Sequence, residues 1–95
     1  MYARVATFQS DPADIDRAIE MVRTEVAGDT PAGLEGARML MLVNRETGKG
    51  LGVTLFESEE AMRRGDEALN AMAASDTPGR RTSVTKYDVA VRLTG

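Results

Sequence analysis

A chain of 95 residues, 42% hydrophobic and 28% charged, is predicted to form one globular domain spanning residues 1–95. Its formal charge of −3 disfavours nucleic acids and anionic membranes as partners, because phosphate contacts need clustered cations. Without Cys or His the chain has no disulfide and no Ser-His or Cys-His nucleophile system. The absence of a signal sequence or a membrane-length apolar run predicts a cytoplasmic protein.

The first predicted elements are a strand and an amphipathic helix. Alternation over Tyr2–Gln9 predicts a strand with one face made by Tyr2, Arg4, Ala6 and Phe8. Asp11 can cap a helix that begins at Pro12 and ends near Gly28. Its apolar residues recur at helical spacing: Ile15, Ala18, Ile19, Val22 and Val26. A loop from Asp29 to Gly36 leads to the next strand.

The second strand, from about Ala37 to Asn44, is apolar on both faces and is predicted to form a hairpin through Glu46-Thr47-Gly48. If Arg45 pairs with Lys49, the residues that face the helices are Met39, Met41, Val43, Leu51, Val53 and Leu55. The opposite face then carries Arg38, Leu40, Leu42, Asn44, Gly50, Gly52, Thr54 and Phe56. A two-residue loop would shift this register by one residue and reverse the faces.

The third strand is predicted over Gly50 to Glu57, and Ser58 can cap the following helix. That helix has core positions at heptad-like spacing: Met62, Gly65, Leu69 and Met72. After a polar loop from Ser75 to Arg81, the last strand is predicted over Ser83 to Leu93. One of its faces carries Thr85, Tyr87, Val89, Val91 and Leu93.

The element order β-α-β-β-α-β predicts a ferredoxin-like α+β fold, a four-stranded antiparallel sheet with two helices on one face. The helices cover a single face, yet the second strand is apolar on both. We therefore expect a second copy of the chain or a ligand to cover the other face. A homodimer with a small-molecule pocket is the predicted assembly.

The run from Val43 to Met62 resembles the hairpin-to-helix core of the antibiotic biosynthesis monooxygenase-like family, in the dimeric α/β-barrel superfamily. The resemblance implies two sheets packed face to face as a homodimeric barrel. It also implies a ligand cleft between each sheet and its helices or inside the barrel. The family includes cofactor-independent oxygenases of aromatic polyketides and haem-degrading enzymes. The haem-degrading branch would carry Asn, Trp and His in its cleft, and this chain has no Trp and no His. Phe56 stands where the family often has Trp.

An oxygenase that activates a phenolic substrate without a cofactor needs a preorganised polar group beside a dry apolar pocket. Arg4, Arg38 and Asn44 are the candidate donors, and Tyr87 or Tyr2 is the candidate for proton transfer. The predicted pocket is lined by Tyr2, Leu40, Leu42, Gly52, Thr54 and Phe56. No cofactor is expected. No metal is expected either, because the helix dipole explains the crowded Asp11, Asp14 and Asp16.

Each candidate also has a purely structural interpretation. Arg4 and Arg38 can form surface or interface ion pairs, Tyr2 and Tyr87 can pack with wet hydroxyls, and Asn44 can serve the adjacent turn. The segment from Gly48 to Gly52 is a weak match to a phosphate loop or an RNA-recognition motif, since it leads into an aliphatic strand. Two functions stay open: a cofactor-independent monooxygenase, or a non-catalytic module that binds a ligand or a partner.

Overall fold

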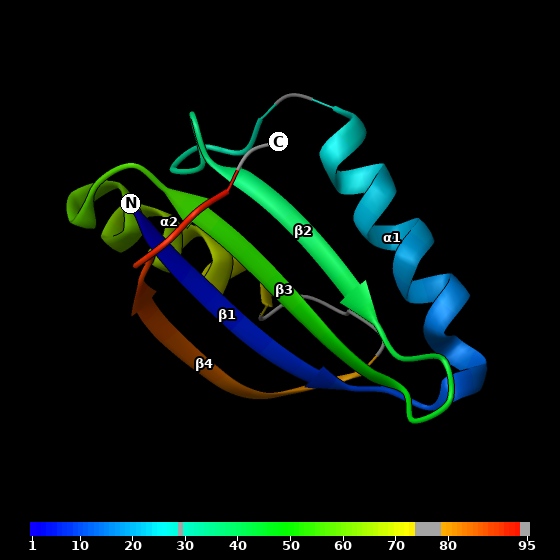
Figure 1. Cartoon of the computed structure of the whole chain (residues 1–95). Coiled ribbons are helices and arrows are strands. Elements are labelled where there is room, and N and C mark those ends of the chain that lie inside the picture. The colour runs from blue at the N-terminus through cyan, green and yellow to red at the C-terminus, as the bar shows by residue number, and fades with distance from the viewer. Residues whose placement is uncertain (29, 74–78, 94–95) are drawn as a thin grey trace.

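In residues 1–28, 30–73 and 79–93, which the computed structural model describes, four antiparallel strands and two α-helices make up the fold (Figure 1). The elements in chain order are β1 (Tyr2–Gln9), the 3₁₀ turn η1 (Pro12–Asp14), α1 (Ile15–Ala27), β2 (Arg38–Val43), β3 (Lys49–Phe56), α2 (Glu59–Ala73) and β4 (Arg80–Asp88). The strand order is β2-β3-β1-β4. Right-handed crossovers place both helices on one face of such a sheet. The predicted ferredoxin-like fold is confirmed.

The predicted capping residues Asp11 and Ser58 both bond backbone amides, although Asp11 caps the 3₁₀ turn η1 and the N-cap of α1 itself is Asp14, which makes no side-chain cap bond. The Asp11 carboxylate accepts a hydrogen bond from the Ala13 amide at 2.9 Å, at the start of η1, which continues into α1. The Ser58 hydroxyl oxygen accepts one from the Ala61 amide at 3.0 Å, in the first turn of α2. These bonds satisfy amides that have no partner within the helix. The predicted core side chains Val26 and Met72, and most of the predicted loop from residue 75, lie outside the described part.

The register predicted for the β2–β3 hairpin is wrong by one residue. Val43 pairs with Gly50 and Leu42 with Leu51. The cause is the turn: the Asn44 side-chain oxygen accepts hydrogen bonds from the amides of Glu46 and Thr47, at 3.0 and 3.2 Å. Gly48, at φ +80°, then returns the chain so that Asn44, rather than Arg45, closes the ladder with Lys49.

This shift reverses the faces of β3. Even-numbered β3 residues pair with even-numbered β1 residues, and the buried members of both strands, Arg4, Ala6, Thr54 and Phe56, all face the helices. Side chains on the opposite side form a surface that we name the open face: Val5, Leu40, Leu42, Leu51, Val53 and Leu55. Gly52, Thr54 and Phe56 were predicted on that surface and lie instead under the helices. Leu51, Val53 and Leu55 move the opposite way.

The end of β4 also differs from the prediction. The strand begins at Arg80, inside the predicted loop, and ends at Asp88 rather than Leu93. Tyr2, the first residue of β1, pairs with Asp88, so only the Met1 carbonyl remains to accept a bond from the Val89 amide, at 3.0 Å. Beyond that point β1 offers no backbone to pair with, and Leu93 is 93% exposed.

The core lies between α2 and the sheet. Leu34, Phe56 and Met62 form its buried cluster, and Gly65 of α2 sits directly over the Phe56 ring. In α1, Ile15 and Ala18 are buried. In contrast, Leu40 and Leu42 on the open face of β2 are 55% and 49% exposed. In the described residues, no helix is both long and apolar enough to cross a bilayer.

Candidate functional site

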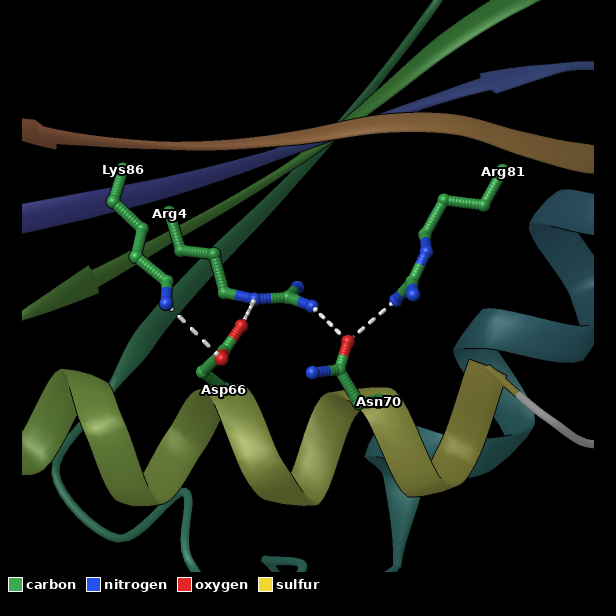
Figure 2. A network of polar contacts seen from close by, with 5 residues as sticks. All are labelled: Arg4, Asp66, Asn70, Arg81 and Lys86. Atoms are coloured by element: carbon green, nitrogen blue, oxygen red, sulfur yellow. Dashed lines mark hydrogen bonds and ion pairs between the residues drawn. The ribbon is translucent and has the colours of Figure 1, made fainter.

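A polar network lies on the helix side of the sheet, where β1 and β4 face α2 (Figure 2). Arg4, only 3% exposed, donates from Nε to the Asp66 carboxylate at 2.7 Å and from Nη2 to the Asn70 amide oxygen at 3.0 Å. From β4, Lys86 Nζ lies 3.2 Å from the other Asp66 oxygen, and Arg81 Nη1 donates to the same Asn70 oxygen at 2.7 Å. Asp66 and Asn70 thus hold cations from two strands.

The spacing of these residues explains why they meet. Asp66 and Asn70 are four residues apart, so they lie one turn apart on the same side of α2. Arg4 on β1 pairs directly with Lys86 on β4, which brings their side chains out on the same side of the sheet. A bulge between Thr7 and Phe8 sets Arg81 opposite Phe8 and turns it towards Asn70.

The network carries more positive than negative charge. Burial raises the pKa of the Asp66 carboxyl, but hydrogen bonds from Arg4 and Lys86, and the positive charges of both, lower it by more. The resulting pKa of Asp66 lies below its ordinary value, so this carboxyl is ionised at neutral pH. Among the described residues, Asp66 is the single carboxylate of the network, and it pairs with Arg4 and Lys86 while Arg81 bonds only the neutral Asn70 amide. The surplus positive charge sits beside a largely buried arginine.

A pocket of about 410 Å³ adjoins the network at the end of the sheet where α2 begins. Its walls are formed by Tyr2, Glu59, Met62, Lys86, Tyr87 and Asp88. Lys86 belongs to both the pocket and the network, and Met62 connects the pocket to the buried core. The pocket is an open, mostly polar depression in which phenol, ammonium and carboxylate groups surround the Met62 side chain.

The predicted catalytic residues do not gather at one place. Arg4 lies in the buried network, on the same face as Tyr2. Arg38 is exposed and points to the open face, because it pairs with Leu55. Tyr87, opposite Ala3, belongs to the open side and borders the pocket from the edge strand. Asn44 lies in the hairpin, where its side chain holds the turn.

The predicted pocket residues are divided between the two faces of the sheet. Tyr2 lines the pocket, while Thr54 and Phe56, 1% and 2% exposed, lie in the packed core below the helices. Gly52 shares their side. Leu40 and Leu42 lie on the open face. The single apolar lining predicted from the sequence does not exist as one surface, because the hairpin register separates its members.

Four residues of the network were not singled out by the sequence analysis: Asp66, Asn70, Arg81 and Lys86. The signal available for the first two is their spacing, which places them next to Gly65 and Leu69, at the edge of the side of α2 that faces the sheet. Polar residues at that boundary need partners. Within the described residues, no group of three or more carboxylates is placed to hold a metal ion.

Comparisons with known proteins support the fold. No protein-family model and no curated protein sequence matches the chain. Among solved structures, it is similar to a candidate antibiotic biosynthesis monooxygenase from Deinococcus radiodurans, with a TM-score of 0.55 and 14% sequence identity over the full length of both chains. The chain therefore shares the fold of this solved structure, as expected from the sequence. At this identity the likeness extends to the fold and not to the chemistry.

Proposed function

We propose that the chain forms a homodimeric α/β barrel that binds a small apolar or aromatic molecule. The open faces of two copies pack against each other, and the ligand occupies the pocket beside Tyr2, Met62 and Lys86. The observation that carries this proposal is the open face, which is apolar on all three strands β1, β3 and β2. The solved structure with the same fold supports the proposal but does not supply the ligand.

The open face has the composition of an interface core. Val5, Val53 and Leu40 are paired across β1, β3 and β2, so they form one apolar row through the middle of the sheet. Leu51 and Leu42 form a second pair beside it. A continuous apolar surface of this kind is uncommon on a monomer, and removing it from water is favourable by about 25 cal/mol per Å², which opposes the entropy cost of association.

The proposed catalytic form of this function is oxygenation without a cofactor. A phenolic substrate with an activated methylene group reacts with O₂ so that the CH₂ becomes C=O, one oxygen atom enters the product and the other leaves as water. Such a reaction begins with loss of a proton to a nearby base and needs positive charge close to the resulting anion. Lys86 at the pocket wall, with Arg4 behind it, supports this role. A non-catalytic binding module needs the pocket alone.

Substitution in the central row of the open face tests the dimer. Light scattering should give twice the chain mass of 10.2 kDa for the natural protein. Val53→Lys should give the mass of a single chain, because two buried ammonium groups would face each other across the interface. Ala27→Lys, at an exposed position of α1, makes the same charge change away from the open face and should keep the dimer. A monomeric natural protein would refute the barrel.

Oxygen uptake with a panel of hydroxylated polycyclic aromatics tests the catalytic form. An enzyme should lose rate in Arg4→Lys while retaining its ligand, whereas a binding module should lose only affinity or stability. Arg38→Lys is the matched control, because the Arg38 side chain lies on the other face of the sheet, and this variant should keep its rate. A loss of rate in Arg38→Lys would instead support the role predicted for Arg38 from the sequence. Ligand binding without oxygen uptake across the panel would leave the binding module as the function.

A further inference from the structure

Two arginines in the network converge on a neutral acceptor. Arg4 Nη2 and Arg81 Nη1 both donate to the Asn70 amide oxygen, at 3.0 and 2.7 Å, from opposite sides (Figure 2). Because they share one oxygen, the two donor atoms lie within about 6 Å of each other, a range at which like charges repel. An amide offers only a dipole to two full charges, whereas arginines are commonly neutralised by a carboxylate or phosphate.

The other residues that the structure describes do not supply the missing negative charge. Asp66 is already shared between Arg4 Nε and Lys86 Nζ, so it balances one of the three cations. Among described residues, no carboxylate bonds to Arg81. Arg81 is exposed and Arg4 is 3% exposed, so the pair joins an accessible guanidinium to one that is largely withdrawn from water. Positive charge in such a place is less screened than on the open surface.

We propose that Arg4, Arg81 and Asn70 form a binding site for a small oxyanion, a carboxylate or phosphate group. The anion accepts hydrogen bonds from the two guanidinium groups at the edge where β4 meets α2, and Asn70 supplies its amide N–H₂ once its oxygen is displaced. Lys86, beyond Asp66, adds long-range attraction. This site lies outside the pocket and does not depend on the proposed dimer, and although it shares Arg4 with the proposed oxygenation, Arg81 and Asn70 belong to the anion site alone.

A purely structural interpretation competes with this proposal. Asn70 lies in the last turn of α2, where the negative end of the helix dipole favours nearby cations. In that interpretation Arg81 stabilises α2 and binds nothing. A carboxylate at position 70 would pair with Arg4 and Arg81 in both interpretations, so the two are distinguished by whether an added oxyanion stabilises the natural protein more than chloride does.

The test compares oxyanions with chloride at constant ionic strength. Phosphate and acetate are titrated separately into the natural protein, and the melting temperature and the heat of binding are followed. The natural protein should be stabilised by at least one of them over chloride, since a bound anion raises stability. Asn70→Asp should melt higher than the natural protein without any anion and should no longer respond to one. The more effective of phosphate and acetate identifies the source of the ligand group.

Arg81→Gln and Arg80→Gln form the matched pair. The residues are neighbours in β4, but Arg80 pairs with Gln9 and points to the other side of the sheet. Arg81→Gln should weaken anion binding roughly 10- to 100-fold, the loss of a charge-assisted hydrogen bond, and Arg80→Gln should leave it unchanged. Equal effects of the two substitutions, no preference over chloride, or an undiminished response in Asn70→Asp would each overturn the proposal. If Asn70→Asp fails to fold, the comparison of Arg81→Gln with Arg80→Gln tests the proposal without it.

Discussion

Gly65, in α2, is predicted not to tolerate an added methyl group. A Cβ atom there would fall well inside van der Waals contact with ring carbons Cε1 and Cζ of Phe56, and 3.4 Å from Leu34 Cδ2. Phe56 is 2% exposed and Leu34 is 3% exposed, so neither side chain has free space into which it can withdraw. Gly65→Ala must therefore displace the helix from the sheet.

Two opposing effects set the change in the free energy of unfolding caused by Gly65→Ala. Replacing glycine by alanine inside a helix stabilises it by about 1 kcal/mol. Overpacking a dense core costs about 1 to 3 kcal/mol, and the overlap with an aromatic ring places this site at roughly 3 kcal/mol. The net loss of about 2 kcal/mol corresponds to a fall in melting temperature of roughly 8 to 16 °C for a domain of this size.

Urea unfolding followed by far-UV circular dichroism, at a fixed protein concentration, measures this loss. Ala71→Gly, at an exposed position of the same helix, calibrates the propensity effect and should cost about 1 kcal/mol. In a Phe56→Leu background the cost of Gly65→Ala should shrink, because the smaller side chain leaves room for the methyl group. A Gly65→Ala variant as stable as the natural protein would show that α2 does not lie against Phe56.

Three further predictions concern local bonds. Asp66→Asn should have a lower free energy of unfolding than the natural protein near neutral pH, and the difference should shrink as the pH falls below about 4. The reason is that the pKa of Asp66 is lowered in the folded state, so the stability that its ionised carboxylate provides is lost when the carboxyl is protonated. Asn44→Ala should cost about 1 kcal/mol in urea unfolding, from the hydrogen bonds to the amides of Glu46 and Thr47. Gly48→Ala should cost more, since the added Cβ would overlap the Ser10 carbonyl oxygen at a positive φ; an unchanged midpoint would contradict the observed turn.

Local sequence patterns predict most of the fold. The strand at Tyr2–Gln9 and the caps at Asp11 and Ser58 agree with the structure, because alternation and capping depend on residues close together in the chain. The hairpin register cannot be predicted by matching apolar residues across the hairpin. β3 could turn towards the helices either its face with Leu51, Val53 and Leu55 or its face with the two glycines, and the apolar pattern does not decide between them. The Asn44 side chain decides it, through two bonds to its own turn.

The candidate site is less accessible to sequence analysis. Arg4 could be proposed, because a charged residue in a strand that packs on helices needs a partner. Its partners could not be assigned, because Asp66 and Asn70 are more than sixty residues away and the alignment of α2 over β1 decides which helical turn faces Arg4. To place Arg81 beside Asn70, one would also have to predict the bulge opposite Thr7 and Phe8, and no turn-forming residue in the sequence indicates that bulge.

The register also separates the two proposed activities in space. Leu51, Val53 and Leu55 lie on the open face, so self-association would use the side of the sheet opposite Arg4 and Asn70. Because β3 alternates, a substitution at Val53 leaves the helix side of its neighbours Gly52 and Thr54 intact. A monomeric Val53→Lys protein that stays folded should therefore keep its response to oxyanions. If that response vanished together with the dimer, the anion would have to bind between subunits, and the assignment of Arg81 and Asn70 to a site within one chain would be wrong.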